Sequence, residues 1–345
     1  YSVDEIWEYT KITKWFLYKF RNLARIEKIL LNIKNIDVLS KKSYVTLKQQ
    51  GFSDKHIGAC LGKDEEFVRN IRLKYDIRPF VKQIDTLAAE FPAQTNYLYC
   101  TYNAEDDDLE FDEHGIMVLG CGAYRIGSSV EFDWSAVSCN RTLKQLGKRS
   151  IMVNYNPETV STDYDECDRL YFEELSLERV LDIYRLEGAG GVIVSVGGQI
   201  PNKLVIPMSQ NGVKILGTQP ENIDRAENRF KFSNLLDTLE IDQPQWNEFD
   251  TLEAAVKFTE EIGYPVIIRP SYVLSGSAMI VAYEKSDLEA YISTLDTVTK
   301  EYPIVISKFI DEAKEIEMDA VACNGQLINY AISEHIENAG VHSGD

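Results

Sequence analysis

Four short apolar runs, separated by stretches of helical length, constrain the fold of this chain more than any other feature of its sequence. The runs are residues 116–120, 150–154, 191–195 and 213–217. Each has the length of a buried strand, and the intervals leave room for a helix between one strand and the next. This alternation predicts an α/β domain with a doubly wound parallel sheet.

The N-terminal part follows a different, helical pattern. Apolar side chains recur at helical intervals up to about residue 36. Gly51 is placed to end a helix, Ser53 is placed to cap the next one, and Gly62 is placed to end it. Short helices joined at a glycine invite a helix-turn-helix interpretation, but residues 52–78 carry five acids and six bases, which make no basic face. We therefore expect a helical packing or self-association domain over residues 1–78.

The rest of the chain divides into two further parts. Residues 79–112 lack clear periodicity, and we expect a connecting segment that joins the parallel-sheet region in a domain over residues 79–228. A second α/β pattern follows, and we expect an incomplete domain over residues 229–345. Its predicted elements are a helix after Asp224, a helix at 252–262, strands at 265–269 and 279–283, a helix at 286–298, and three antiparallel strands at 304–309, 315–322 and 326–334.

Glycines follow two of the predicted parallel strands. Gly120 and Gly122 begin a turn that resembles a dinucleotide fingerprint, but Gly127 comes too late for the third glycine, and no ribose-binding acid ends the second strand. We therefore do not expect a nicotinamide cofactor and interpret this turn as close packing of strand and helix. Gly197 and Gly198 permit close backbone approach at a ligand-binding edge, which is a weak signal by itself.

Arg269 carries the strongest chemical signal. It ends an apolar strand and stands directly before the small-residue loop 270–278. A fixed cation with backbone N–H groups folding over it suits a phosphate chain, whereas the alternative is a snorkelling arginine before an ordinary turn. The apolar strand at 305–310 can pair its backbone with an adenine edge, and Glu315 can accept hydrogen bonds from ribose hydroxyl groups. The alternative is an amphipathic strand followed by a solvated carboxylate. No Walker A sequence is present.

Charge and cysteine usage exclude several classes of protein. The net charge of −19 opposes a nucleic-acid or anionic-membrane partner, and no apolar run reaches the roughly 20 residues that span a bilayer. The six cysteines are scattered, with no CxxC pair and no neighbouring histidine at zinc-ligand spacing, so we expect reduced thiols. His335 and His342 flank Glu337, but the carboxylate pairing of a metal cluster is absent. We expect no metal site among these residues.

A series of segments, in the right order, resembles the carbamoyl phosphate synthetase large chain. The segments cover its helical oligomerisation domain, the start of its second synthetase half, its pre-ATP-grasp domain and its second ATP-grasp domain. They are residues 15–18 and 51–55, then 81–86, then 125–133, 156–163 and 197–199, and finally 269–278 and 334–345. The resemblance implies a pre-ATP-grasp domain followed by a truncated ATP-grasp domain.

The resemblance implies an ATP-dependent ligase. In this family one half makes carboxyphosphate from bicarbonate, ammonia converts it to carbamate, and the half represented here phosphorylates carbamate with a second ATP. The implied partners are the first synthetase half, a glutaminase domain or subunit that supplies ammonia, and further copies of the chain in a homo-oligomer. The implied compartment is the cytoplasm, or alternatively the mitochondrial matrix.

The resemblance also implies an ATP site, with Arg229 and Arg269 on the phosphates and Arg269 as the residue acting on the transition state. Mg²⁺ would bridge the phosphates, with ligands expected beyond Asp345, and a K⁺ ion is implied near Glu315, Glu337 and Ser343. The other implied contacts are the Lys308 and Ile310 backbone for adenine, Glu315 for ribose, and Gly340, Val341, His342 and Ser343 beside the triphosphate.

Two alternatives remain open, and the pathway is ambiguous. The chain could be another ATP-grasp ligase of the biotin-carboxylase kind, or a non-catalytic assembly module. Residues 226–232 lean toward the multifunctional pyrimidine-pathway protein, whereas residues 173–179 lean toward the urea-cycle type. The chain lacks an initiator Met and ends abruptly at Asp345, so we expect a piece of a longer protein that is inactive alone.

Overall fold

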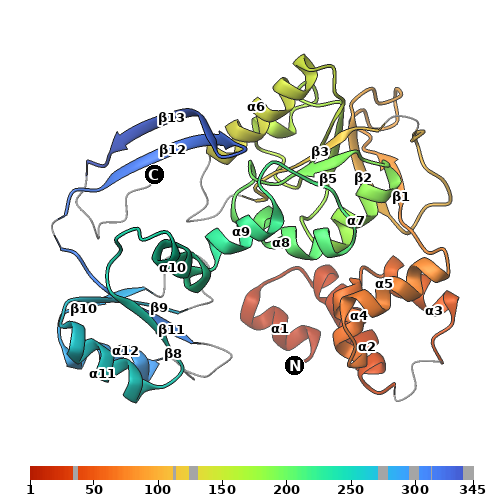
Figure 1. The fold of residues 1–345 in the computed structure, drawn as a ribbon. Coiled ribbons are helices and arrows are strands. Elements are labelled where there is room, and N and C mark those ends of the chain that lie inside the picture. Colours follow the sequence, from red (N-terminus) through yellow and green to blue (C-terminus); the bar gives the residue numbers. More distant parts are fainter. Residues whose placement is uncertain are drawn as a thin grey trace. The chain divides into compact units, whose positions relative to one another are not determined.

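The computed structural model describes residues 1–33, 38–111, 114–123, 131–270, 279–294, 303–311 and 313–336 (Figure 1). By its internal contacts the chain divides into two units. The first consists of Tyr1–Tyr124 and Val130–Thr218, and the second of Arg125–Ser129 and Gln219–Asp345. Within the described ranges, no helix combines the length and the apolar character needed to cross a bilayer.

In the described residues up to 74, the first unit opens with five α-helices: α1 (Val3–Thr10), α2 (Lys14–Leu31), α3 (Lys41–Gln49), α4 (Asp54–Leu61) and α5 (Glu65–Lys74). The helical pattern expected up to about residue 36 is confirmed, and it is divided between α1 and α2. Lys11 has φ 56° and its N–H bonds to the Trp7 carbonyl, which ends α1 with a local cap. The predicted caps are confirmed, since Ser53 accepts from the His56 N–H and Gly62 ends α4 in the left-handed conformation.

The helices pack around one apolar core. Leu30, Tyr44, Phe52, Ile57 and Val68 come from different parts of the helical region and are all nearly or fully buried. Because no single helix of this length is stable alone in water, this shared burial holds the helical arrangement together. The packing also fixes α2 against α4.

A seven-stranded sheet forms the rest of the first unit. Its order is β1-β2-β5-β4-β3-β6-β7, and every neighbouring pair is parallel except β1 with β2. The predicted doubly wound parallel sheet is therefore confirmed. The strands are β1 (Phe80–Gln83), β2 (Tyr97–Thr101), β3 (Ile116–Leu119), β4 (Ser150–Asn154), β5 (Arg169–Phe172), β6 (Gly191–Ile193) and β7 (Ile215–Leu216), with helices α6 (Glu131–Gln145), α7 (Leu177–Leu186) and α8 (Gln199–Gln210) and the 3₁₀ helix η2 (Val160–Thr162) between them.

Two predictions about this sheet were wrong. The segment 79–112 is not only a connection, because it contains the edge strands β1 and β2. Strand β5 was not predicted at all. Strands β1 and β5 are no shorter than the predicted strand β3, but polar side chains such as Lys82 and Arg169 interrupt them, so they do not form the continuous apolar run of a buried strand. Pairing with neighbouring strands makes them strands.

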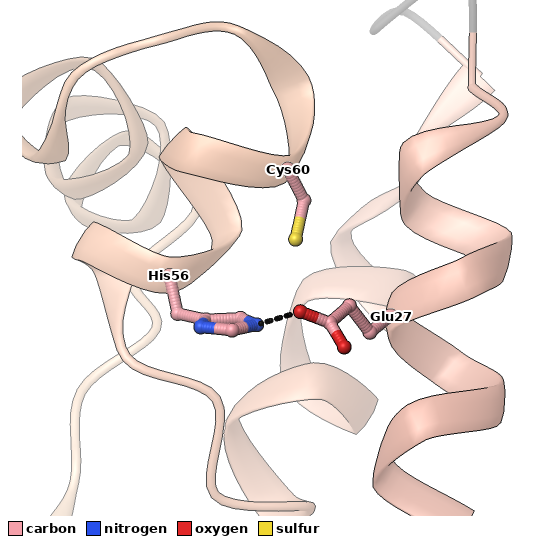
Figure 2. Close-up of side chains that lie close together, drawn as sticks. All are labelled: Glu27, His56 and Cys60. Atoms are coloured by element: carbon pink, nitrogen blue, oxygen red, sulfur yellow. Dashed lines mark ion pairs between the residues drawn. The ribbon is translucent and has the colours of Figure 1, made fainter.

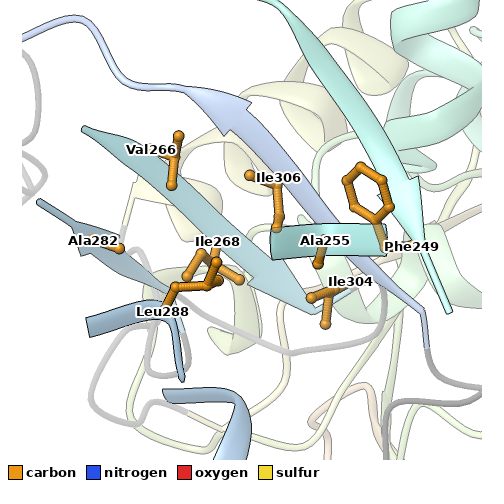
Figure 3. Packing of buried hydrophobic residues seen from close by; sticks show 8 residues of the cluster. All are labelled: Phe249, Ala255, Val266, Ile268, Ala282, Leu288, Ile304 and Ile306. Atoms are coloured by element: carbon orange, nitrogen blue, oxygen red, sulfur yellow. The ribbon is translucent and has the colours of Figure 1, made fainter. Parts of the chain in front are cut away.

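The second unit contains a smaller, antiparallel sheet. Its order is β10-β9-β11-β8. Figure 3 shows Val266 and Ile268 of β9 and Ile304 and Ile306 of β11 gathered with Ala255 and Leu288 of the covering helices. The elements are α9 (Pro220–Glu227), α10 (Arg229–Thr238), β8 (Trp246–Phe249), α11 (Leu252–Ile262), β9 (Val266–Pro270), β10 (Ile280–Ala282), α12 (Lys285–Thr294) and β11 (Ile304–Lys308).

A separate hairpin completes the described part of the second unit. Strands β12 (Ile316–Cys323) and β13 (Gln326–Glu334) pair only with each other in the described sheets, and the side chains of both are exposed. The last three predicted strands were expected to run antiparallel, and each pairs antiparallel in the structure. They do not form one sheet, because β11 pairs with β8 and β9 in the four-stranded sheet.

Candidate nucleotide site

Arg269 lies on β9, in the middle of the small antiparallel sheet. Val266 and Ile268 of the same strand are fully buried in the core with α11 and α12. Because side chains alternate along a strand, Arg269 projects from the opposite face of the sheet. Its side chain is half-buried, and its Nε atom is buried without a hydrogen-bond partner in the described part of the chain. This is an unusual position for a cation, since a buried donor ordinarily has an acceptor.

Arg229 is the first residue of α10. The side chain of Asn228 caps this helix by accepting a hydrogen bond from the Lys231 N–H at 3.0 Å. Arg229 is half-buried, and its Nη2 lies 3.9 Å from the sulfur of Met279, which precedes β10. Two segments 40 positions apart, the start of α10 and the end of β9, thus both supply an arginine to the second unit.

The two guanidinium groups affect one another. Burial lowers the pKa of Arg229. Burial also lowers the pKa of Arg269, and the positive charge of Arg229 lowers it further. Among the described residues, no carboxylate forms an ion pair with Arg269. An anion placed beside these two groups would offset both the desolvation and the mutual repulsion, so the pair suits a phosphate.

Lys308 ends β11, and its side chain is bound within the protein. The ammonium group donates to the carbonyl oxygens of Gly263 at 3.1 Å and Tyr264 at 2.7 Å. Its backbone N–H donates to the Gln245 carbonyl at 2.8 Å. The side chain of Lys308 therefore anchors the turn before β9, and its backbone N–H is already bonded within the protein.

The remaining predicted residues are distributed between described and undescribed segments. Ile310 follows β11 and is 55% exposed. Glu315 immediately precedes β12, its carbonyl accepts from the His335 N–H at 3.0 Å, and its side chain is half-buried. Gly340, Val341, His342 and Ser343, together with Glu337 and the loop 271–278, lie outside the described residues.

A cavity of about 460 Å³ in the second unit is not this site. It is lined by Trp246, Phe258 and Ile262, with the acids Asp237 and Glu261 at its wall. None of the predicted nucleotide residues contributes to it. Acidic walls repel phosphate, so this cavity is a poor place for a nucleotide tail.

The structure also brings together three residues that sequence reasoning missed. Glu27, His56 and Cys60 place one ligand atom each within 4.8 Å of one another. The statement that no histidine stands near a cysteine at ligand spacing was wrong, because His56 and Cys60 lie four residues apart on α4. The i, i+4 spacing was the signal available in the sequence.

The fold is that of an α/β protein, and two half-buried arginines of its second unit form a pair that suits a phosphate-bearing ligand. Three family models match the chain in order: the carbamoyl-phosphate synthetase large chain oligomerisation domain at residues 1–76, the carbamoyl phosphate synthase preATP-grasp domain at 112–225, and the carbamoyl-phosphate synthase L chain ATP binding domain at 228–342. The chain belongs to the carbamoyl-phosphate synthase large-chain family.

Similar proteins include mitochondrial, multifunctional and arginine-specific members of this family. The chain is 57% identical to the mitochondrial carbamoyl-phosphate synthase [ammonia] of Mus musculus, 56% to the multifunctional protein URA2 of Saccharomyces cerevisiae, and 56% to the carbamoyl phosphate synthase arginine-specific large chain of Cutaneotrichosporon cutaneum. Each match covers 100% of this chain but only 23%, 16% and 29% of the respective relative. The chain thus spans less than a third of the length of these relatives.

Proposed function

We propose that this chain is part of the carbamate-phosphorylating half of a carbamoyl phosphate synthetase. A carbamate oxygen attacks the γ-phosphorus of ATP, the bond from that phosphorus to the β,γ-bridging oxygen breaks, and the products are carbamoyl phosphate and ADP. The observation that carries the proposal is the pair Arg229 and Arg269, two half-buried cations whose pKa values are both lowered. Family membership supports it.

The proposed role of each residue is the one that the family resemblance implies. Arg229 and Arg269 hold the phosphates, and Arg269 also stabilises the charge that develops on the transferring group. The backbone at Lys308 and Ile310 holds the adenine, and Glu315 accepts from the ribose hydroxyl groups. Gly340, Val341, His342 and Ser343 complete the wall beside the triphosphate.

Mg²⁺ enters this proposal as a partner of the nucleotide. Mg²⁺, when bound, neutralises phosphate charge during the transfer. Mg²⁺ requires oxygen ligands, whereas the paired arginines offer only positive charge, so these two residues do not fit Mg²⁺. We therefore propose Mg²⁺ ligands beyond Asp345. We also propose K⁺ near Glu315, Glu337 and Ser343, of which Glu315 alone is described.

The wider assembly is likewise a proposal. Carbamate decomposes in water, so a first synthetase half and a glutaminase domain or subunit in the same assembly would deliver it under protection. We propose a homo-oligomer joined through the helical region, on the basis of the matching oligomerisation model. We place the protein in the cytoplasm, with the mitochondrial matrix as the alternative, and in pyrimidine or arginine/urea biosynthesis, because similar relatives carry names from each context.

The test compares matched arginine variants in the longer synthetase that contains this segment. Arg269→Ala is expected to slow ATP formation from carbamoyl phosphate and ADP by a factor of about 100 to 1,000, which is typical when one group stabilising transition-state charge is removed. Arg225→Ala removes an exposed guanidinium of α9 and should leave the rate unchanged. An Arg269→Ala enzyme with undiminished rate would contradict the proposal.

A second candidate is an assembly module without catalysis. The match of residues 1–76 to an oligomerisation domain favours it. Titration of ADP into the same synthetase separates the two functions. ADP binding that is lost in Arg269→Ala and Glu315→Ala supports the enzyme, whereas no ADP binding by the parent at this half supports the module.

A further inference from the structure

Three side chains of the helical region converge at a point remote in sequence from every proposed nucleotide contact. His56 and Cys60 project from α4, and Glu27 projects from α2 toward them (Figure 2). The His56 Nε2 atom lies 3.2 Å from a Glu27 carboxylate oxygen, and the Cys60 sulfur points into the same space. An imidazole nitrogen, a thiol and a carboxylate are the ligand set that zinc proteins use.

We propose that Glu27, His56 and Cys60 form a binding site for a divalent transition-metal cation, and that Zn²⁺ is the ion it suits best. A mixed nitrogen, sulfur and oxygen set with tetrahedral geometry is typical of Zn²⁺, whereas Mg²⁺ and Ca²⁺ require oxygen ligands.

The distances fit this ion. Zinc bonds of about 2.0–2.1 Å to nitrogen and oxygen place two such ligands roughly 3.3 Å apart in a tetrahedron. The His56 to Glu27 separation of 3.2 Å is therefore already that of a zinc-bound pair. The sulfur needs to come within roughly 3.6 Å of the nitrogen, starting from at most 4.8 Å. A small side-chain adjustment achieves this.

The surrounding packing holds the two helices in place for such a site. Leu23 and Ile26 of α2 pack on the same buried cluster as Ile57 of α4, so the backbones that carry the ligands are fixed by core contacts. The ring of His56 also lies 5.4 Å from that of Phe52, which orients the imidazole. A rigid frame that positions ligands before the metal arrives favours binding.

A fourth coordination position is available beside the three ligands. A cavity of about 400 Å³ is lined by Glu27 and His56 together with the apolar side chains of Phe20, Leu23 and Phe52. A water molecule or a small ligand in this cavity can reach a metal held by the two polar groups. Three protein ligands with an open position distinguish this arrangement from closed structural zinc sites.

The thiol has to lose its proton when the metal binds. Burial raises the pKa of the Cys60 thiol, and the nearby charge of Glu27 raises it further. The metal-free thiol is therefore protonated at neutral pH, and the cation takes the place of this proton. This opposes binding but does not prevent it, because a coordinated thiol is readily deprotonated.

The experiment is a Co²⁺ titration of the 345-residue chain. Co²⁺ takes the geometry of Zn²⁺ and reports its ligands by absorption. We expect one equivalent to produce visible bands of tetrahedral Co²⁺ and a near-ultraviolet thiolate-to-cobalt charge-transfer band, and one equivalent of Zn²⁺ to abolish both. The absence of the charge-transfer band in the parent chain would overturn the proposal.

Four variants assign the signal to these residues. Cys60→Ser should lose the charge-transfer band, and His56→Ala should weaken Co²⁺ binding by at least about tenfold. Cys323→Ser removes an exposed thiol, and His335→Ala removes another histidine paired with a glutamate, Glu317, at 2.7 Å. Both should titrate like the parent. The metal-free Cys60→Ser variant should melt at the same temperature as the parent. If it then kept the thiolate-to-cobalt charge-transfer band, the assignment of Cys60 as a ligand would be wrong.

Discussion

At the scale of single residues, the surroundings of an arginine decide whether its charge is available to a ligand. Arg269 is half-buried, carries a lowered pKa and has an unsatisfied Nε, so it is poised for an anion. Arg72 is fully buried but surrounded by carboxylates. Burial opposes its charge, yet the carboxylates of Asp182 and Asp54 outweigh that opposition and raise its pKa. Only the first of these arginines has chemistry to offer a ligand.

A surface pair allows a test of pH dependence at this scale. Arg141 donates from Nε to one Glu166 carboxylate oxygen at 2.8 Å and from Nη2 to the other. This bond lowers the pKa of Glu166 below its ordinary value of 4.5. Because the folded-state pKa is the lower one, the stabilisation is complete above about pH 4.5 and is lost as the pH falls through the folded-state pKa.

The corresponding variant is Glu166→Gln. We expect it to melt below the parent at pH 7, and the difference in melting temperature to shrink steadily below pH 4.5. Thermal melts over a pH series measure this. Adding Arg141→Gln to Glu166→Gln serves as the control and should change the pH dependence no further. A melting difference that grows toward acid pH would contradict the assignment of the pair.

At the scale of elements, local signals predicted helices better than short strands. The capping residues Ser53 and Gly62 and the helix at 252–262 were predicted correctly, because hydrogen bonds between near neighbours decide them. Strands β1 and β5 were missed, since Lys82, Gln83 and Arg169 interrupt the apolar runs by which the other strands were predicted. Their pairing in the sheet shows that they are strands.

Gly58 gives a test at this scale. In a helix interior, replacing glycine by alanine normally stabilises by about 1 kcal/mol. At Gly58 of α4, however, an added Cβ would lie 2.7 Å from the Asp64 carbonyl oxygen and 2.8 Å from that of Lys63. Backbone atoms cannot move aside easily, so we expect Gly58→Ala to destabilise the first unit by about 1–3 kcal/mol.

The neighbouring position provides the matched control. Ala59 is exposed on the same helix, and Ala59→Gly should cost only the ordinary helix propensity, about 1 kcal/mol. Urea denaturation followed by circular dichroism measures both variants. If Gly58→Ala proved more stable than the parent, the close approach of α4 to the turn before α5 would be wrong.

At the scale of the whole molecule, a buried ionic cluster joins the helical region to the parallel sheet within the first unit. Lys48, Arg69 and Arg72 of the helices meet Asp54 and, from α7, Glu178 and Asp182, and all six side chains are at most 5% exposed. Three cations balance three carboxylates, so the cluster is neutral. Such a cluster tolerates no single missing partner.

Arg72→Met tests the cluster. Asp54 at 2.8 Å and Asp182 at 3.1 Å both lose a cation, and the buried charge left behind should cost about 3–5 kcal/mol. Arg141→Met, on the exposed surface, should cost far less. Three of the four tryptophans lie in the first unit, and Trp246 lies in the second. Both variants are therefore made in a Trp246→Phe background, in which tryptophan fluorescence during urea denaturation reports the unfolding of the first unit alone. A midpoint for Arg72→Met equal to that of Arg141→Met would refute the role of the cluster.

The sequence by itself determined the helix boundaries with clear caps, the parallel sheet of apolar strands, the arginine at the end of β9 and the family to which the chain belongs. Each is encoded by residues adjacent in the chain or by a segment pattern. Only the tertiary structure decided which strands form the sheet edges, that the Lys308 side chain anchors a turn, and that Glu27 meets His56 and Cys60. These depend on contacts between distant segments, whose free energy no local pattern records.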